Sequence, residues 1–157
     1  MVPCEKRFSK LTCKLSKGVC SVKFTPTAAG SSVLLTASYG GNSKNSQSAG
    51  TYGLTVSTVD PKTTVSCTPK SAAAGASAVI TCTAKVTGYS PTGTVSWSQS
   101  GAGSVSFASA TCTLSQGKCS VTMTGSTGGH VTITATYSGD PNNQRSSRTA
   151  KLTIKNA

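Results

Sequence analysis

Val131-Thr-Ile-Thr-Ala-Thr-Tyr-Ser-Gly-Asp140 is the stretch that decides the fold class. Its apolar side chains alternate with threonines from Val131 to Tyr137, and a turn sequence follows. Period-two alternation is typical of a β-strand with one buried face. The same alternation recurs along the rest of the chain between clusters of Gly, Pro, Asn and Ser, and no segment has the 3.6-residue apolar period of a helix. The sequence therefore predicts an all-β protein.

Parts of the chain occur twice. Leu34-Leu-Thr-Ala-Ser-Tyr-Gly-Gly41 matches residues 132–139, and Leu11-Thr-Cys-Lys-Leu-Ser-Lys-Gly-Val-Cys-Ser-Val22 matches residues 110–121. The two matches have almost the same offset, of about 98 residues, so the chain contains a repeat of that length. We therefore expect residues 59–157 to be one complete unit. Residues 1–58 supply only the C-terminal part of a preceding unit.

Three motifs of the complete unit carry a resemblance to a known family. They are Pro91-Thr-Gly-Thr-Val-Ser-Trp97, Cys119-Ser-Val-Thr122 and the stretch Val131–Asp140. Together they resemble the bacterial and archaeal Ig-like repeats of surface proteins, over all of 59–157 and, through the repeat, most of 8–58. The resemblance implies an immunoglobulin-like β-sandwich, and about seven short strands in such a length agree with that fold.

The aromatic residues have expected places in such a sandwich. We expect Trp97 to fill the core, as the tryptophan of an Ig sandwich does. Tyr39 and Tyr137 end equivalent apolar strand faces, so core packing is expected for both. The strand that carries Val131 to Tyr137 has no cysteine, so no antibody-type disulfide between the sheets is expected from it.

The composition argues against an enzyme. The chain has 15 Lys and Arg, only 3 Asp and Glu, and a single histidine, His130. Paired carboxylates, histidine ligand sets and Ser-His-Asp arrangements have almost nothing to be built from. We expect no catalytic residue, no cofactor and no metal site. No apolar run is long enough to cross a membrane as a helix, and the first residues do not read as a signal peptide.

Seven cysteines and no CxxC pair favour disulfides over metal sites. Two pairs repeat one arrangement around a Gly-containing turn, and we expect each to be a cross-strand disulfide of a hairpin. A third pair lies on the first two strands of the complete unit. The predicted disulfides are Cys13–Cys20, Cys112–Cys119 and Cys67–Cys82. Cys4 is left over, and either its partner belongs to the missing half-unit or it pairs with another chain. Disulfides of this density favour an extracellular or cell-surface location.

The net charge of +12 has two interpretations. In the first, basic residues near the two ends form patches that bind acidic cell-surface polymers. The candidate residues are Lys6, Arg7, Lys10, Arg145 and Arg148. In the second, outward lysines only keep strand edges soluble. Specific nucleic-acid binding is not expected, because no recognition helix or stacking aromatics accompany the charge. The scarcity of carboxylates suggests a protein suited to an acidic exterior.

The expected function is structural. We predict a non-enzymatic spacer module of an extracellular or cell-surface protein, whose partners are neighbouring Ig-like domains or copies of itself. One alternative is a filament (pilus-like) or surface-layer subunit, whose incomplete N-terminal sandwich is completed by strands from another subunit. A further alternative is a basic module that binds acidic surface polysaccharide.

Overall fold

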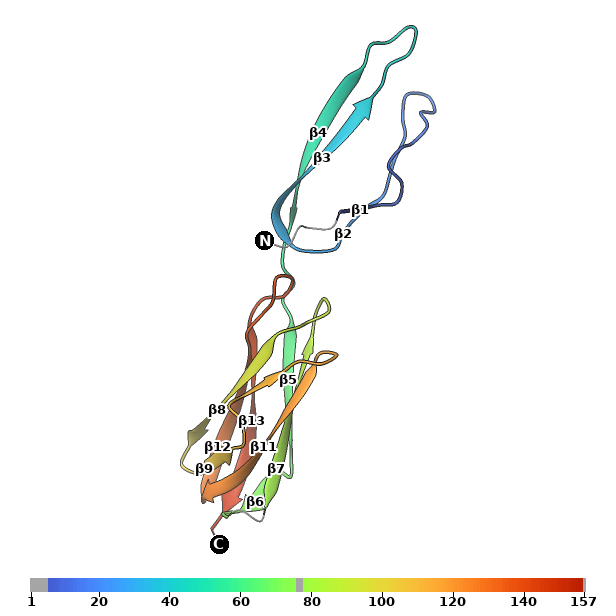
Figure 1. Cartoon of the computed structure of the whole chain (residues 1–157). Helices are drawn as coiled ribbons and strands as arrows, with labels where there is room; N and C mark the ends of the chain where they lie inside the picture. Colours follow the sequence, from blue (N-terminus) through green and yellow to red (C-terminus); the bar gives the residue numbers. More distant parts are fainter. Residues whose placement is uncertain (1–5, 76–77, 157) are drawn as a thin grey trace. The chain divides into compact units, whose positions relative to one another are not determined.

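The computed structural model describes residues 6–75 and 78–156, and within them every regular element is a β-strand. The chain divides into two compact units, Met1–Thr58 and Val59–Ala157 (Figure 1). The first unit contains β1 (Lys6–Phe8), β2 (Phe24–Pro26), β3 (Gly30–Tyr39) and β4 (Ser48–Val56). The second unit contains β5 (Lys62–Thr68), β6 (Ser71–Ala73), β7 (Val79–Thr87), β8 (Thr94–Gly101), β9 (Ser104–Phe107), β10 (Thr111–Thr113), β11 (Lys118–Thr127), β12 (Gly129–Tyr137) and β13 (Ser146–Lys155).

The second unit is a sandwich of two sheets. One sheet has the order β10-β8-β12-β13-β6 and the other has the order β5-β7-β11-β9. The unit thus has more strands than the seven that the sequence suggests, because the short strands β6 and β10 extend the edges of the five-stranded sheet. The expectation of an all-β, immunoglobulin-like sandwich is confirmed.

The core of the second unit lies between its two sheets. Along β12 the alternation is strict: the apolar residues from Val131 to Tyr137 are buried, and the threonines between them are half-buried. Ile80, Cys82 and Ala84 of β7 are fully buried on the facing sheet. Trp97 is 5% exposed and belongs to the same core, as expected. Threonine therefore serves as the outer face of strands whose inner face is apolar.

The second unit has its entry and exit at opposite ends. Val59 pairs in parallel with Asn143, which precedes β13, so the chain enters beside the start of β13. At the other end, β13 pairs in parallel with β6, where Ile154 lies opposite Ala72. Figure 1 shows β5 and β13 running the length of the unit. A force that pulls on both ends would therefore load the terminal strands along their length.

The first unit repeats much of the strand pairing of the second, apart from a register shift between Gly30 and Val33. The hairpin β3–β4 places Val33 opposite Leu54, as β12–β13 places Val131 opposite Leu152. In the β1–β2 pair, Phe8 lies opposite Phe24, and the rings are 5.2 Å apart. The equivalent pair in the second unit is Phe107 opposite Met123. The first unit thus contains counterparts of β9, β12, β13 and part of β11.

The inner face of the first unit is less covered than that of the second. Val33 is buried, but Ala37 is exposed and Tyr39 is half-buried. Their counterparts in the second unit, Ala135 and Tyr137, are both 0% exposed. The expectation of a fully packed Tyr39 is therefore wrong. The physical reason is that the described part of the first unit has no strand in the places that β7 and β8 occupy in the second.

Candidate functional site

The structure brings together the six cysteines of the three pairs. The disulfides are Cys13–Cys20, Cys67–Cys82 and Cys112–Cys119. Cys67 lies directly opposite Cys82 in the β5–β7 ladder, with their Cα atoms 4.0 Å apart, so this disulfide links neighbouring strands of one sheet. Both of its cysteines are buried, whereas those of the other two are half-buried. Cys4 lies outside the described residues.

The Cys112–Cys119 disulfide differs from the expected hairpin link. A tight turn joins Ser115 to Lys118, and Gln116 and Gly117 at its centre both have positive φ. Beyond the turn, however, the strands separate: β10 pairs with β8 in one sheet, and β11 pairs with β7 in the other. The disulfide therefore joins the two sheets of the sandwich. Sequence spacing located the pair but not this role, because strand pairing is decided by β7 and β8.

Trp97 packs against this inter-sheet disulfide. Its indole Nε1 donates to Cys112 Sγ at 3.1 Å. Further along β8, the side-chain amide of Gln99 exchanges two hydrogen bonds with the backbone of Val105, at 2.7 and 2.6 Å. Gln99 therefore ties β8 to β9 of the opposite sheet. The two sheets are thus held together at two places, by the disulfide between β10 and β11 and by Gln99 of β8.

The turn between β12 and β13 holds a polar network centred on Asp140. Its carboxylate accepts hydrogen bonds from the backbone N–H of Thr92 at 2.8 Å, from the hydroxyl of Tyr137 at 2.9 Å and from the side chain of Asn143 at 2.9 and 3.0 Å. Asn143 is 1% exposed and continues the network: its Oδ1 accepts from the N–H of Tyr89, and its Nδ2 donates to the carbonyl of Tyr89. The sequence indicated a turn here, but not that this turn is hydrogen-bonded to the β7–β8 loop.

This network shifts two pKa values in opposite directions. Burial by itself would raise the pKa of Asp140. The hydrogen bonds from Thr92, Asn143, Asn142 and Tyr137 outweigh that effect, so its pKa lies well below the ordinary value. Burial raises the pKa of Tyr137 to about 12, and the hydrogen bond to Asp140 and its negative charge act in the same direction. The network thus depends on an ionised Asp140 and a neutral Tyr137.

The five basic residues predicted to bind polyanions are divided between the units. Lys6, Arg7 and Lys10 belong to the first unit, with Lys6 and Arg7 in β1. Arg145 lies just before β13, and Arg148 of β13 lies opposite Ala135 of β12. The two arginines are exposed. The structure does not show these residues forming one site.

Three other lysines gather on one sheet face. Lys85 and Lys118 lie directly opposite each other on β7 and β11, and Lys62 of β5 lies diagonally beside Lys85. All three are exposed. We call them the lysine face. Like charges directly opposite each other in a sheet repel, and an anion between them would relieve that repulsion. A sequence pattern could not reveal them, because they come from three separate strands.

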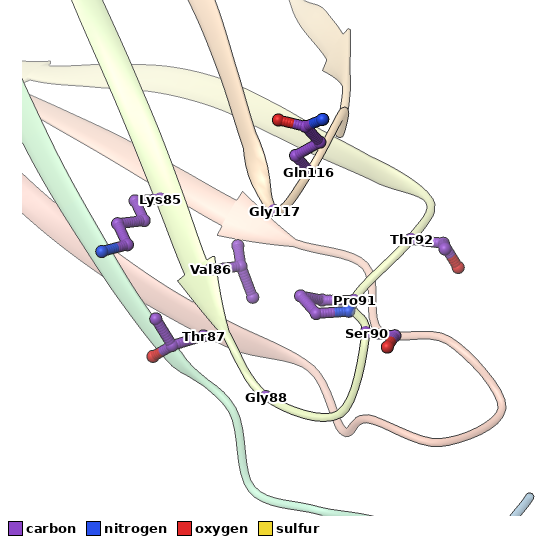
Figure 2. Close-up of a pocket in the computed structure, with 9 residues that line it drawn as sticks. All are labelled: Lys85, Val86, Thr87, Gly88, Ser90, Pro91, Thr92, Gln116 and Gly117. Carbon is purple, nitrogen blue, oxygen red and sulfur yellow. The ribbon is translucent and has the colours of Figure 1, made fainter. Parts of the chain in front are cut away.

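A shallow cavity of about 540 Å³ lies beside the lysine face. Figure 2 shows its lining, with Val86 and Pro91 toward the middle and Lys85 and Gln116 farther out. Of its lining residues, only Lys85 is ionisable, so the cavity offers no acid–base pair for catalysis. Within the described part of the chain, no three His, Cys, Asp or Glu residues lie close enough to hold a metal ion. Nor does any helix of the described residues have the length and apolarity needed to cross a membrane.

The first unit contains a larger cavity of about 1030 Å³. Its walls are the loop closed by the Cys13–Cys20 disulfide and the end of the β3–β4 hairpin, including Ala37 and Tyr39. We call it the acceptor groove. In the second unit, Val95 and Trp97 of β8 lie opposite Tyr137 and Ala135 of β12, and all four belong to the closed core. The groove thus marks where the first unit lacks a core.

Residues 64–155 match the family described as bacterial Ig-like domain (group 3). The match covers more than half of the chain. The chain belongs to this Ig-like family. Its disulfide-bonded second unit is thus the family's domain, from the middle of β5 to the end of β13.

Several solved structures are similar to this Ig-like chain over most of its length. The D00-D0 domain of intimin has 16% identity and a TM-score of 0.48, over 95% of this chain and 77% of its own. The Yersinia pseudotuberculosis adhesin InvE has 15% identity and a TM-score of 0.48, over 98% of this chain and 49% of its own. Domains 1–6 of the surface layer protein SbsC have 15% identity and a TM-score of 0.41, over 98% of this chain and 28% of their own. The chain thus spans about half of InvE and about a quarter of that SbsC structure. No curated protein sequence matches the chain.

Proposed function

We propose that this chain is a non-enzymatic structural spacer of an extracellular or cell-surface protein, and that its second unit bears tension between its ends. The observation that carries the proposal is the opposite placement of entry and exit in that unit. Membership of the bacterial Ig-like family supports it. The three disulfides favour an oxidising, extracellular location.

The terminal strands suit this role. Force on the two ends pulls β13 against β6 in opposite directions along a parallel pair, so the hydrogen bonds of that pair are loaded together rather than one after another. Parallel bonding continues on both sides of the pair: the Thr153 N–H donates to the Lys70 carbonyl, and the Ala74 N–H donates to the Lys155 carbonyl. The disulfides then limit how far the unit extends once these bonds break.

Single-molecule pulling tests the proposal. The Cys67–Cys82 and Cys112–Cys119 disulfides span 15 and 7 residues. At about 3.5 Å per residue, and less the 4.0 and 5.8 Å that the disulfides already span, reduction should lengthen the fully extended second unit by about 67 Å. We expect one cooperative rupture of the unit, at a force well above that of an Ala72→Pro variant, whose change lies in β6 opposite Ile154. If the unchanged unit and the Ala72→Pro variant both unfolded strand by strand at low force, a load-bearing role would be ruled out.

The lysine face supports a second candidate function, the retention of acidic surface polymers. Lys85→Gln combined with Lys118→Gln should elute from a heparin column at clearly lower salt than the unchanged chain. The matched control is Arg145→Gln with Arg148→Gln, which removes the same charge from the residues that the sequence suggested. Equal shifts for the two double variants would show that only net charge matters, and this candidate would fail.

A further inference from the structure

We infer that the acceptor groove binds a β-hairpin with the chemistry of this protein's own β7–β8 segment. Such a hairpin has two strands with alternating apolar and Ser/Thr residues, joined by a short loop. The inference goes beyond the proposed spacer role, which requires only the second unit.

The first argument comes from the edge of β3. Among the described strands, β3 pairs only with β4. Its counterpart β12 pairs with β13 on one side and with β8 on the other, where Thr134 lies opposite Ser98 and Ala135 opposite Trp97. From Val33 to Tyr39, the register of β3–β4 equals that of β12–β13 from Val131 to Tyr137. The outer edge of β3 is therefore in place to receive a strand like β8, and Thr36 would face the Ser98 position.

The second argument comes from the segment after the first disulfide. Residues 20–23 belong to no strand, although their counterparts, residues 119–122, lie within β11 and pair with β7. The turn before them already has the β11-type form: Ser16 and Val19 exchange backbone hydrogen bonds, as Ser115 and Lys118 do. Lys17 and Gly18 also share the positive φ of Gln116 and Gly117. The turn before this segment thus has the β11-type form, whereas the segment itself has no β7 with which to pair.

The third argument comes from the turn that follows β3. Asn42 and Asn45 form the same closed turn as Asp140 and Asn143, and the Asn42 side-chain oxygen accepts from Asn45 N and Nδ2 as Asp140 accepts from Asn143. In the second unit, Asn143 reaches onward to both backbone groups of Tyr89 in the β7–β8 loop. Asn45, in contrast, is exposed. Its amide is positioned to bind the loop of an incoming hairpin.

These three features share one missing partner. In the second unit, the strand beside β11, the loop bound by Asn143 and the strand beside β12 all belong to the continuous segment Val79–Gly101. A single hairpin would thus satisfy all three places and fill the groove with apolar side chains. The hairpin of a second copy is not available for this purpose, because its β7 is bonded to its own β5 through Cys67–Cys82 and is buried. The occupant is therefore a hairpin that is free of such a sandwich.

A synthetic peptide tests this inference directly. The peptide has the sequence of residues 79–101 with Cys82→Val, carries a fluorophore, and is titrated into the full chain with Cys4→Ser while anisotropy is recorded. We expect saturable one-to-one binding that a peptide of scrambled sequence does not show. No binding, or equal binding of the scrambled peptide, would overturn the inference.

Two variants of β3 locate the binding site. Ala37→Glu places a charge on the face that lines the groove, and we expect it to weaken binding at least about tenfold, because the peptide would bury that charge. Leu34→Glu is the matched control, since Leu34 is 60% exposed and has the opposite orientation on the same strand. Binding that Ala37→Glu does not change would contradict the inference.

Cross-linking tests the register. A chain with Thr36→Cys should form a disulfide with a peptide carrying Ser98→Cys several times faster than with one carrying Ser96→Cys, because Ser96 would lie opposite Ser38. Equal rates would exclude the proposed register. Sedimentation without peptide tests whether a second copy of the chain occupies the groove instead. A stable dimer that Ala37→Glu dissociates would show that it does, and the inference would be wrong. Each of these results leaves the pulling experiment on the second unit unaffected.

Discussion

The Asp140 carboxylate accepts hydrogen bonds from four residues of the second unit. Thr92 lies in the β7–β8 loop, and the other three donors, Tyr137, Asn142 and Asn143, lie close to Asp140 in the sequence. Hydrogen bonds to a charged group contribute more to stability than neutral ones do. We therefore expect Asp140→Asn to lower the free energy of unfolding by about 2 kcal/mol. Denaturant unfolding followed by Trp97 fluorescence measures the change. Asp60→Asn is the control, because Asp60 is exposed ahead of β5; a comparable loss in that variant would mean that net charge is responsible.

The lowered pKa of Asp140 predicts where stability depends on pH. A carboxyl group whose pKa is lower in the folded state stabilises the fold above its unfolded pKa of about 3.9, and this contribution is lost as the pH falls toward the folded value. The melting temperature should thus stay nearly constant from pH 7 to about 4 and decline below it. In Asp140→Asn the decline should be much smaller. This refines the hypothesis of an acid-suited protein, because we expect one carboxylate, that of Asp140, to contribute to stability.

The raised pKa of Tyr137 predicts a second limit at high pH. A group whose pKa is raised by folding contributes stability below its unfolded pKa of about 10, and this is lost as the pH rises toward the folded value of about 12. Tyr137→Phe keeps the buried ring and removes the ionisable hydroxyl. Its melting temperature should consequently fall less than that of the unchanged chain between pH 10 and 12, as measured by circular dichroism. Parallel declines in both proteins would contradict the assignment.

At the scale of the elements, the disulfides differ in how well the strands cover them. Cys67 and Cys82 are buried within the β5–β7 ladder, whereas Cys112 and Cys119 are half-buried between β10 and β11. A reductant must reach a sulfur atom to attack it. Under native conditions we therefore expect Cys112–Cys119 and Cys13–Cys20 to be reduced before Cys67–Cys82. Alkylation with timed quenching and peptide mass mapping gives the order. Simultaneous loss of all three would indicate global unfolding instead.

At the scale of the whole chain, the two units should differ in stability. The second unit has a closed core, whereas the inner face of the first is partly exposed and its β1–β2 and β3–β4 pairs stand as separate two-stranded sheets. Two-stranded pairs are marginal by themselves. Backbone amides of β3 and β4 should exchange with solvent at least about a hundredfold faster than those of β12 and β13. Hydrogen-exchange mass spectrometry checks this, and the residue 79–101 peptide should slow exchange in β3. Equal protection in the two units would contradict the expectation.

By itself, the sequence determined the fold class, the repeat and the cysteine pairs. These signals are local: alternation such as that of Val131 to Tyr137 reports one buried face, and the repeated cysteines stand a short, constant distance apart. Tertiary structure alone decided that Cys112–Cys119 joins two sheets, that Asp140 ties the β7–β8 loop to the β12–β13 turn, and that Lys62, Lys85 and Lys118 share a face. Each of these depends on which distant strands pair. Strand pairing is a non-local property, set by how the two sheets bury their apolar faces together, and no short stretch of sequence contains it.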